Sequence, residues 1–300
     1  MDLRPLGQTG LRVSVLGLGA AGIAGLYQKL TDDDAATVVR AALDSGVSYV
    51  DTAPLYGSGA SERRIGLALR QHPRGPECVA ATKLGYVPQD YDYSFDATIR
   101  SVEASRERLG LDRIPIVQIH EIRLEIWDAV VDPHGALAAL RKLRADGVIG
   151  HIGVTGSDVP TVLRALATGE FETVFFWHYF HLLDDAGCEV LDDAQRRGMG
   201  ALIGTPFAGG ILASGCGPDA KYFYRPAPDH VQAKVRPIEE LCRSLGISLR
   251  AAALQYCLRH PAVAAVVAGA DSPLHVEQNV AALAETIPDE LWSPLTRLVV

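Results

Sequence analysis

The chain has 300 residues, of which 48% are hydrophobic and 21% are charged, and 29 of them are glycines. This composition indicates a globular protein with a substantial core and many turns, and it excludes a disordered chain. With 28 Lys and Arg residues against 36 Asp and Glu residues, the formal net charge is -8. No overall basic field is therefore available to hold a nucleic acid or an anionic membrane surface.

The N-terminal segment and the cysteines favour a cytoplasmic protein. The segment MDLRPLGQTGLRVSVLGLG lacks the charged start, apolar centre and cleavage pattern of a secretion signal. No apolar run reaches the ~18 residues of a membrane span. The five cysteines are widely spaced, without a CxxC pair or a cysteine and histidine cluster at metal-ligand spacing. We expect reduced thiols, no bound metal, and a monomer or small homo-oligomer that acts on a small molecule.

In chain order, short apolar runs that predict buried strands alternate with longer amphipathic segments that predict helices. Several amphipathic segments, such as DDDAATVVRAALDSG, begin at acidic residues and end at glycine, as helix ends favour. The predicted strands are residues 13–19, 47–53, 78–83, 114–120, 150–155, 173–179, 200–205 and 264–269. Eight alternating units predict an α/β protein, a (β/α)8 TIM barrel formed by residues 1–300 as a single domain.

Two segments depart from this alternation. Residues 4–14, RPLGQTG followed by LRVS, predict an N-terminal β-hairpin with a Gln-Thr-Gly turn, which could plug the bottom of the barrel. Residues 211–230 form a long loop with several Gly and Pro residues after strand 7 of the predicted barrel. Loops of this length are usually functional when they belong to a compact domain.

Residues 17–22 match the GxGxxG pattern of a dinucleotide-binding Rossmann turn, directly after a strand. The residues that follow, IAGLYQKLTDDD, lack the long helix and the second strand ending in an acidic residue that this fold requires. Gly25 also interrupts the helix. We therefore favour the barrel, in which glycines at a strand end still let a ligand approach the backbone closely.

Four polar side chains follow apolar strands in the first half of the chain: Asp51 and Tyr56 in DTAPLYG, Lys83 in AATKLG, and His120 in IVQIHE. Each alone has a structural explanation, such as a turn, a packed aromatic ring, a solvated strand end or a satisfied core histidine. Together they favour a site, because a parallel barrel gathers the carboxyl ends of its strands on one face.

These four side chains can couple a proton transfer to a hydride transfer. A tyrosine hydroxyl, with an ordinary pKa of about 10, is a poor acid or base near neutrality. A lysine ammonium beside Tyr56 would lower the pKa of that hydroxyl, and Asp51 would hold Lys83 charged and oriented. Tyr56 could then exchange a proton with a carbonyl or hydroxyl oxygen, to which His120 would supply a second hydrogen bond.

The segments DTAPLYG with SGASE, ATKLG, the strand-end histidine, GVTG and GADSPLHVEQN together resemble the aldo-keto reductase superfamily over essentially the whole chain. The resemblance implies a (β/α)8 barrel that binds a nicotinamide cofactor across its top, with Asp51, Tyr56, Lys83 and His120 as the catalytic tetrad. The segments HEIRL and FETVFFWHYFHLLDD are similar to the L-galactose dehydrogenase and D-threo-aldose dehydrogenase branch.

The same resemblance places the adenosine end of the cofactor along AAVVAGADSPLHVEQN. Gly269 and His275 occupy positions at which NADP-preferring relatives usually carry Lys and Arg, and Asp271 would repel a 2'-phosphate. We therefore predict NAD as the preferred cofactor, with NADP possible. Asp271 could instead cap the helix that begins at Pro273. The predicted cofactor-binding residues are Gly19, Ala20, Asp51, Thr155, Thr205, Gly269, Asp271, His275, Gln278 and Asn279.

Around the nicotinamide, the sequence departs from the common family pattern. Thr155 and Gly156 stand where many relatives have Ser and Asn, Trp177 stands where a glutamine is common, and Gly204 replaces the usual stacking tyrosine. The hydroxyls of Thr155 and Thr205 are the remaining candidates for contact with the carboxamide.

Aromatic residues with interspersed hydrogen-bonding groups predict the substrate pocket, because such walls suit a sugar ring or an aromatic aldehyde. Core packing is the alternative explanation for each of them. The predicted substrate-binding residues are Tyr56, His120, Trp127 and His178, and the further wall candidates are Tyr179, His181, Tyr222, Phe223 and Tyr224.

The leading interpretation is an NAD-dependent aldose 1-dehydrogenase that oxidises the anomeric hydroxyl of a sugar, such as L-galactose or L-fucose, to a lactone. One alternative is an NADP(H)-dependent reductase of aldehydes or ketones. Another, from a different class, is a nicotinamide-binding regulatory subunit. The same tetrad serves oxidation and reduction, so the sequence leaves the sugar and the physiological direction open.

Overall fold

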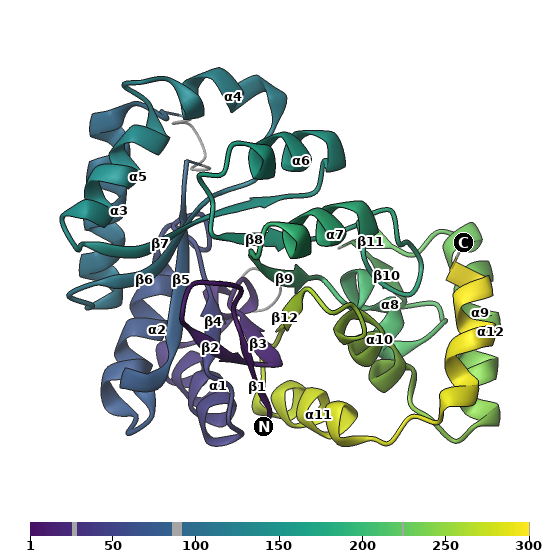
Figure 1. The fold of residues 1–300 in the computed structure, drawn as a ribbon. Coiled ribbons are helices and arrows are strands. Elements are labelled where there is room, and N and C mark those ends of the chain that lie inside the picture. Colours follow the sequence, from purple (N-terminus) through teal and green to yellow (C-terminus); the bar gives the residue numbers. More distant parts are fainter. Residues whose placement is uncertain (26–28, 86–91, 224, 300) are drawn as a thin grey trace.

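The computed structural model describes residues 1–25, 29–85, 92–223 and 225–299. At its centre is a closed barrel of eight parallel strands in the order β12-β3-β4-β5-β6-β7-β8-β9 (Figure 1). The barrel strands are β3 (Leu16–Gly19), β4 (Tyr49–Asp51), β5 (Val79–Leu84), β6 (Ile114–Ile119), β7 (Ile149–Gly156), β8 (Thr173–Phe176), β9 (Gly200–Gly204) and β12 (Val263–Gly269). The predicted (β/α)8 barrel is confirmed. Its closed sheet rules out the Rossmann alternative, which has an open sheet.

One predicted strand is divided in the structure. Residues 13 and 14 belong to β2 (Arg12–Ser14), which pairs antiparallel with β1 (Leu3–Pro5), whereas the barrel strand begins only at Leu16. The hydroxyl of Ser14 donates to the carbonyl of Leu16, and the amide of Ser14 donates to the hydroxyl of Ser48. These bonds fix the turn between hairpin and barrel, which the continuous apolar run did not reveal.

The N-terminal hairpin closes the end of the barrel at which the strands begin. Leu6 and Val13, both 0% exposed, pack with Tyr49, Val79 and Leu202 inside the barrel. In Figure 1 the hairpin, at the purple end of the colour scale, lies within the ring of helices. The predicted plug is therefore present, and it keeps the apolar side chains at this end of the barrel away from water.

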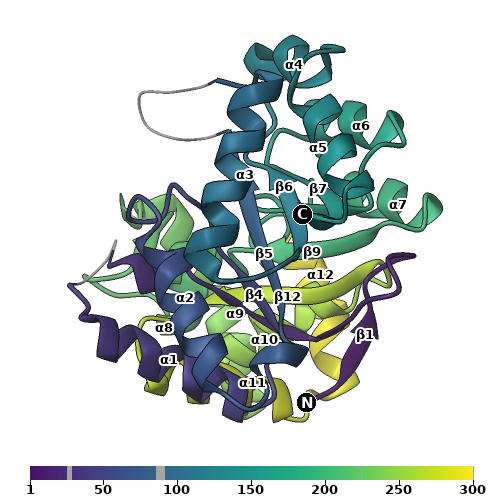
Figure 2. The same cartoon turned by 90° about the vertical axis from the view of Figure 1, so that its left-hand side faces the viewer.

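A ring of helices covers the outside of the barrel, and Figure 2 shows α2 and α3 side by side on its outer face. Thr31 and Asp34 form a capping box at the start of the first helix, and Ser94, Asp158 and Ser248 cap later helices. The helices are α1 (Asp32–Asp44), α2 (Ala60–Gln71), α3 (Phe95–Leu109), α4 (Leu124–Val131), α5 (Ala136–Ala145), α6 (Val159–Ala167), α7 (Cys188–Arg196), α9 (Asp229–Ser244), α10 (Leu249–Leu258), α11 (Pro273–Ala284) and α12 (Trp292–Val299).

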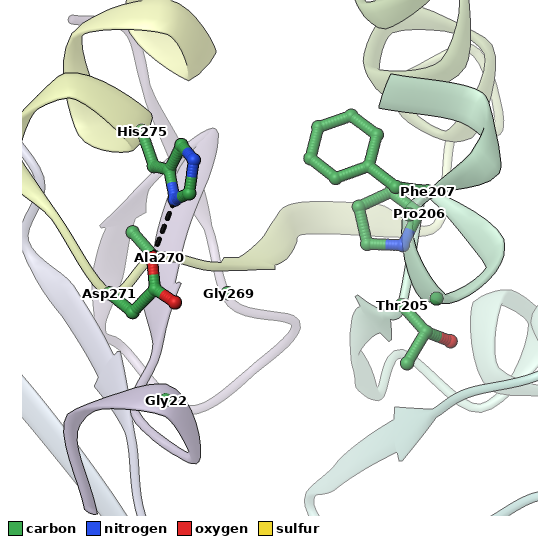
Figure 3. A pocket seen from close by; sticks show the side chains of 10 residues that line it. Gly22, Thr205, Pro206, Phe207, Gly269, Ala270, Asp271 and His275 are labelled. Carbon is green, nitrogen blue, oxygen red and sulfur yellow. Dashed lines mark hydrogen bonds and ion pairs between the residues drawn. The ribbon is translucent and has the colours of Figure 1, made fainter. Parts of the chain in front are cut away.

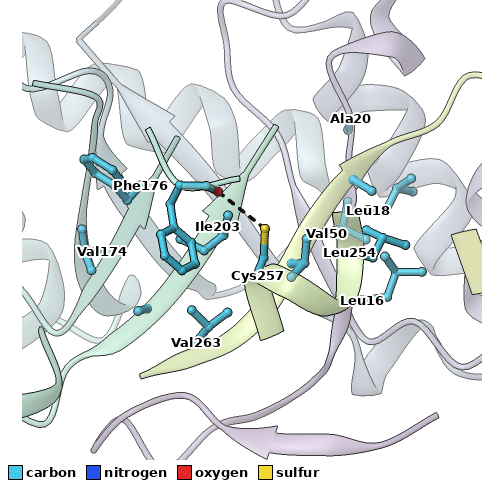
Figure 4. Packing of buried hydrophobic residues seen from close by; sticks show 14 of the residues in the cluster. Leu16, Leu18, Ala20, Val50, Val174, Phe176, Ile203, Leu254, Cys257 and Val263 are labelled. Atoms are coloured by element: carbon cyan, nitrogen blue, oxygen red, sulfur yellow. Dashed lines mark hydrogen bonds between the residues drawn. The ribbon is translucent and has the colours of Figure 1, made fainter. Parts of the chain in front are cut away.

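The main core lies between the barrel strands and these helices. Side chains alternate along each strand, so that on β4 Val50 packs in this outer core while Tyr49 packs inside the barrel. Figure 4 shows part of the outer core, where Leu254 and Cys257 of α10 lie among strand side chains. The thiol of Cys257 donates to the carbonyl of Phe180 at 3.5 Å. All five cysteines are free thiols.

The predicted long loop after the seventh barrel strand carries short elements of its own. These are η3 (Ala208–Gly210), α8 (Ile211–Ser214) and the antiparallel pair β10 (Lys221–Tyr222) and β11 (Arg225–Pro226). The amide of Phe223 donates to the carbonyl of Ala208 at 3.2 Å, so the loop folds back on η3. Tyr224, a predicted wall residue, lies outside the described residues.

The part of the chain that the structure describes also contains the short helices η1 (Gly22–Ala24), η2 (Gly75–Glu77) and η4 (Asp289–Leu291). Within the described ranges, no helix is both long and apolar enough to cross a membrane. The same residues contain no group of three or more His, Cys, Asp or Glu side chains that could hold a metal ion.

Candidate active site

The carboxyl ends of β4, β5 and β6 bring the four predicted catalytic side chains together. Asp51 ends β4, Lys83 lies near the end of β5, and His120 follows β6, while Tyr56 comes from the turn after β4. The ammonium of Lys83 forms an ion pair with Asp51, donates to the carbonyl of Thr52 at 2.8 Å, and lies 3.5 Å from the hydroxyl of Tyr56. The ring of His120 stands edge-on to that of Tyr56, with 6.0 Å between the ring centroids.

Lys83 and Asp51 are a buried ion pair, with side chains only 2% and 3% exposed. Burial alone would lower the pKa of Lys83, but the neighbouring Asp51 and Tyr56 outweigh it and raise this pKa above its ordinary value. The three hydrogens of the ammonium are directed to Asp51, to the Thr52 carbonyl and to Tyr56. A charged lysine therefore faces the tyrosine hydroxyl.

His120 is neutral near pH 7. Burial, with the positive charges of Lys83 and Arg123, holds the pKa of His120 well below its ordinary value. A neutral imidazole has one N–H donor and one acceptor nitrogen. It can therefore donate a hydrogen bond to a substrate oxygen without placing a second cation beside Lys83.

Asp51 has two further buried neighbours that the sequence analysis missed. The amide of Gln118 on β6 donates to Asp51 Oδ2 at 2.9 Å, and the hydroxyl of Tyr49 lies 3.5 Å from the same oxygen. Burial, reinforced by the Asp51 carboxylate, raises the pKa of Tyr49 well above its ordinary value, so its hydroxyl remains a donor. The available signal was a glutamine within the otherwise apolar strand IPIVQIH.

The tetrad borders a cavity of about 380 Å³ at the carboxyl ends of the strands, which is within the usual size range of small-molecule sites. A second hollow of about 190 Å³ adjoins it, and Gly22, Thr205 and Gly269 line both. We call the two hollows together the trough. The predicted residues that line the larger hollow are Gly19, Ala20, Asp51, Tyr56, Lys83, His120, Thr155, Thr205 and Gly269.

Two threonine hydroxyls in the larger hollow are oriented by backbone amides. Thr155 Oγ1 accepts from the amide of Glu121 at 2.7 Å, and Thr205 Oγ1 accepts from the amide of His178 at 3.2 Å. Each hydroxyl therefore keeps its own hydrogen to donate to an acceptor in the cavity. Glu121, His178 and Thr205 have φ angles of 55°, 83° and 53°, a strained region for residues with a side chain that is concentrated at functional sites.

Gly204 leaves room for two aromatic side chains, Phe175 of the neighbouring strand β8 and Trp177 directly after it. A Cβ at this glycine would lie 2.5 Å from the ring of Phe175 and 3.1 Å from the Cβ of Trp177. Phe175 and Trp177 both line the cavity. Phe175 and Trp177 therefore form this part of the cavity wall. By the family resemblance, a tyrosine in place of Gly204 would stack on the nicotinamide here.

Glu121 also lines the cavity, and the sequence analysis did not assign it to a site. Its carboxylate accepts from the indole N–H of Trp177 at 2.6 Å and from the hydroxyl of Ser157 at 2.8 Å. Burial raises the pKa of Glu121, although these hydrogen bonds oppose the shift. The contacts fix the Trp177 ring in the cavity wall. An acidic residue directly after His120 was the available signal.

Two residues lie in the core instead: Trp127, predicted to bind substrate, and His181, a candidate for the pocket wall. Trp127 on α4 is 7% exposed, and the guanidinium carbon of Arg164 lies 4.1 Å from the centroid of its ring system. His181 is 0% exposed, and its Nδ1 accepts from the amide of Leu183 at 3.2 Å. Burial lowers the pKa of His181 to about 4. Neither side chain lines the trough, so the core-packing alternative describes both of them.

His178 belongs to an aromatic cluster beside the trough. Its ring centroid lies 3.8 Å from that of Phe223 and 4.3 Å from that of Tyr179, and Tyr222 packs against Phe223 at 4.6 Å. These side chains do not line the two hollows, but the amide of His178 reaches Thr205 at their shared border. The cluster therefore supports the cavity wall from behind.

The structure excludes one of the two alternatives for Asp271. The cap of α11 is Ser272, whose hydroxyl accepts from the amide of His275 at 3.3 Å, so Asp271 does not cap this helix, and its contact with the cofactor stays a prediction. Asp271 instead lies 2.6 Å from Nδ1 of His275, and both line the smaller hollow. Figure 3 shows these two side chains facing one another, with Pro206 and Phe207 on the opposite side.

Gln278 and Asn279 make contacts that the sequence could not reveal. Arg250 of α10 donates to Oδ1 of Asn279 at 2.7 Å and to Oε1 of Gln278 at 3.1 Å. Its guanidinium carbon lies 5.1 Å from the ring centroid of Phe207, which lines the smaller hollow. A strong cation thus stands behind the predicted adenosine end of the site, but it comes from a different helix and its hydrogen bonds are directed to α11.

A closed (β/α)8 barrel that holds a lysine and carboxylate pair beside a tyrosine and a neutral histidine, over a cavity at the strand ends, defines a barrel oxidoreductase. Residues 15–299 match the model of the Aldo/keto reductase family, and the chain belongs to this family. It is therefore an oxidoreductase that acts on carbonyl or alcohol groups. The family uses nicotinamide cofactors.

The chain is similar over most of its length to several characterised dehydrogenases. It is 34% identical to pyridoxal 4-dehydrogenase of Microbacterium luteolum, covering 98% of this chain and 96% of that protein. It is 34% identical to D-threo-aldose 1-dehydrogenase of Pseudomonas sp (95% and 94% covered) and 32% identical to L-galactose dehydrogenase of Arabidopsis thaliana (95% and 89% covered). Among solved structures, an aldo-keto reductase of Bacillus halodurans in its holo form has a TM-score of 0.85 at 26% identity, covering 99% of this chain and 96% of that one.

Proposed function

We propose that the protein is an NAD-dependent aldose 1-dehydrogenase that oxidises the anomeric hydroxyl of a cyclic sugar, such as L-galactose or L-fucose, to a lactone. The observation that carries this proposal is the contact chain from Asp51 through Lys83 to Tyr56 at the border of a cavity of about 380 Å³. Two of the similar dehydrogenases are named for aldose substrates, which supports the sugar as substrate class.

In the oxidative direction, Tyr56 in its phenolate form removes the proton of the anomeric hydroxyl. The hydride leaves the carbon that carries this hydroxyl. Bound NAD supplies the hydride acceptor. Lys83 stabilises the phenolate form of Tyr56, since its ammonium lies 3.5 Å from that hydroxyl and stays charged beside Asp51. Neutral His120 donates a hydrogen bond to the reacting oxygen and fixes its position. The products are the lactone, the reduced cofactor and the proton now held by Tyr56.

The residues of the trough fit a nicotinamide dinucleotide. Gly19 and Gly269 present backbone without side chains where β3 and β12 lie side by side, so a ligand can approach the backbone closely. Thr155 and Thr205 each keep a hydroxyl hydrogen to donate, as the carboxamide oxygen of nicotinamide requires. Trp177 offers an apolar ring surface in the same cavity.

The smaller hollow supports NAD over NADP. The described residues that line it include no Lys or Arg. They do include the carboxylate of Asp271, which lies 2.6 Å from Nδ1 of His275. A 2'-phosphate placed there would be repelled by this carboxylate, whereas a free ribose hydroxyl could donate a hydrogen bond to it. Arg250 is not among the residues that line this hollow, and two of its five N–H groups donate to Gln278 and Asn279.

The substrates that these relatives share chemically are cyclic hemiacetals. An aldose closes to a hemiacetal through one of its hydroxyls, and pyridoxal, with an aldehyde beside a hydroxymethyl group, closes in the same way. Oxidation of either ring at its hemiacetal carbon gives a lactone. Trp177 and Tyr56 supply apolar ring surface in the cavity, while Glu121 and His120 supply polar atoms. This combination suits a ring with apolar faces and a hydroxylated rim.

A carbonyl reductase that uses NADP(H) is the second candidate. The observation in its favour is His275, which is 47% exposed at the smaller hollow and could face a phosphate when protonated. Because proton and hydride transfers are reversible, Tyr56 and His120 would serve reduction as well. Cofactor and substrate alone separate the two candidates.

The test is a matrix of cofactors and substrates with the purified protein. NAD and NADP are each combined with L-galactose, L-fucose, other aldoses and pyridoxal, and NADH and NADPH with simple aldehydes, while the absorbance of reduced nicotinamide is followed. The Tyr56→Phe variant is the control for turnover at the site. We expect the highest kcat/KM with NAD and an aldose. NADPH-linked aldehyde reduction without NAD-linked aldose oxidation would contradict the proposal and favour the second candidate.

A further inference from the structure

Gln118 lies inside the barrel, beside Asp51 and Lys83 of the proposed tetrad. It is 0% exposed, and it lies opposite Lys83 in the pairing of β5 and β6. Its side-chain amide donates to Oδ2 of Asp51 at 2.9 Å, whereas Oδ1 of Asp51 receives the ammonium of Lys83. Each carboxylate oxygen thus has its own strong donor. No other side-chain amide contacts Asp51 in the hydrogen bonds of the described residues.

The buried ion pair makes this amide important. A carboxylate removed from water is stable only if its remaining lone pairs find donors. The hydroxyl of Tyr49 is 3.5 Å from Oδ2 of Asp51, a long distance for a hydrogen bond between oxygens. The Gln118 amide is therefore the principal donor to this oxygen. It also prevents the carboxylate from rotating, so that Oδ1 stays directed at Lys83.

The amide is held for this contact at a cost. Oε1 of Gln118 is buried and finds no partner in the described structure, which is unfavourable for an amide oxygen. An apolar side chain of similar volume would avoid this penalty, and Ile114 and Ile116 occupy the same strand. The orphaned oxygen points to a role for Gln118 beyond packing.

We infer that Gln118 is a positioning residue for the reaction: its amide fixes the Asp51 carboxylate so that Lys83 directs its third hydrogen at Tyr56. This inference rests on the proposed role of Tyr56 in the reaction. Without the amide, Oδ2 loses its donor and the carboxylate draws the ammonium more strongly to itself. The field of Lys83 at Tyr56 is then weaker, and the phenolate forms only at higher pH.

The test compares Gln118→Met with Thr173→Val. Methionine keeps the length and volume of glutamine without its donor. Thr173 also faces the barrel interior, because a Cβ on Gly153 would clash with its hydroxyl and would lie 2.9 Å from Cγ of Gln118. Its hydroxyl is likewise buried without a partner, but it has no bond to Asp51. The control thus removes a polar atom from the same part of the interior and leaves the ion pair intact.

The first readout is the pH dependence of kcat for oxidation. For Gln118→Met we expect the limb in which activity rises with pH to move upward by about 1 pH unit, because a hydrogen bond to a charged group corresponds to roughly that shift. Activity near neutral pH should then fall about tenfold, with KM for the cofactor unchanged. Thr173→Val should keep the wild-type limb. A Gln118→Met enzyme with the wild-type limb and kcat would overturn the inference.

The second readout needs no substrate. The ultraviolet absorbance of phenolate is titrated in the wild type and in Gln118→Met, each corrected by the same protein with Tyr56→Phe. We expect the Tyr56 contribution to titrate at higher pH in Gln118→Met, and an unchanged titration would count against the inference. If the wild type fails to oxidise aldoses, the proposed substrate is wrong, whereas the titration still decides the role of Gln118. A uniform fall in kcat with neither curve moved would show that Gln118 is only a packing residue.

Discussion

Replacing Lys83 with methionine should affect catalysis and stability through one buried charge. At the observed 3.5 Å between the Lys83 ammonium and the Tyr56 hydroxyl, a unit charge stabilises a phenolate by about 5 kcal/mol at an effective dielectric constant of about 20. The Asp51 carboxylate opposes this field, and a net effect of about half that size remains. Lys83→Met should therefore lower kcat for oxidation about a hundredfold near neutral pH.

The same substitution should also destabilise the fold. It leaves Asp51 charged and 3% exposed without its counter-ion, and breaking a buried pair in this way costs about 3 to 5 kcal/mol. Adding Asp51→Asn removes the unpaired charge, so the double variant should recover about 2 kcal/mol or more of this loss without recovering activity. Urea unfolding gives the stabilities, and steady-state kinetics at saturating cofactor gives kcat. A single variant within tenfold of wild-type kcat, or a double variant no more stable than the single one, would refute this reasoning.

Three further predictions concern single positions. Tyr56→Phe should lower kcat by about 10² to 10⁴-fold while the dissociation constant for NAD, measured by fluorescence titration, stays within a factor of about two; retained turnover would show that Tyr56 is not the base. His275→Arg should tighten NADP binding far more than NAD binding in the same titration, because it adds a permanent cation beside the hollow lined by Asp271; equal effects on both cofactors would contradict the assignment of this hollow. His181 binds its proton more weakly when folded, with its pKa lowered to about 4, so stability should be lost as pH falls from about 6.5 towards 4, by about 2 kcal/mol between pH 7 and pH 5. In urea unfolding, His181→Phe should lose less stability than the wild type over this interval, and an equal loss in both proteins would exclude His181 as a source.

The barrel could be predicted from the sequence because its signal is repeated. Each buried parallel strand is a short apolar run, and each covering helix has an amphipathic period, so local patterns identified all eight strands. The division of residues 13–19 was missed, because a hairpin strand and a barrel strand that follow one another directly read as a single apolar run. Only the hydrogen bonds of Ser14 separate them.

The candidate site likewise contains residues that the sequence identified and residues that it did not. Asp51, Lys83 and His120 were predictable because a polar residue at the end of a buried strand is conspicuous. Trp127 illustrates the opposite case: an aromatic residue in a helix looks the same in the sequence whether its ring faces a pocket or the core, and here it packs under Arg164. Arg250 was missed because its partners on α11 are about thirty residues away in the chain.

The sequence by itself determined the fold, the four residues of the proposed tetrad and the likeness to aldo-keto reductases, because these depend on residue type and on periodic position. The tertiary structure alone decided that Ser272 rather than Asp271 caps α11, that Glu121 holds Trp177 in the cavity wall, and that Gln118 donates to Asp51. Hydrogen bonds depend on direction and on distances of about 3 Å, and neither is encoded in the spacing of residues along a strand or helix.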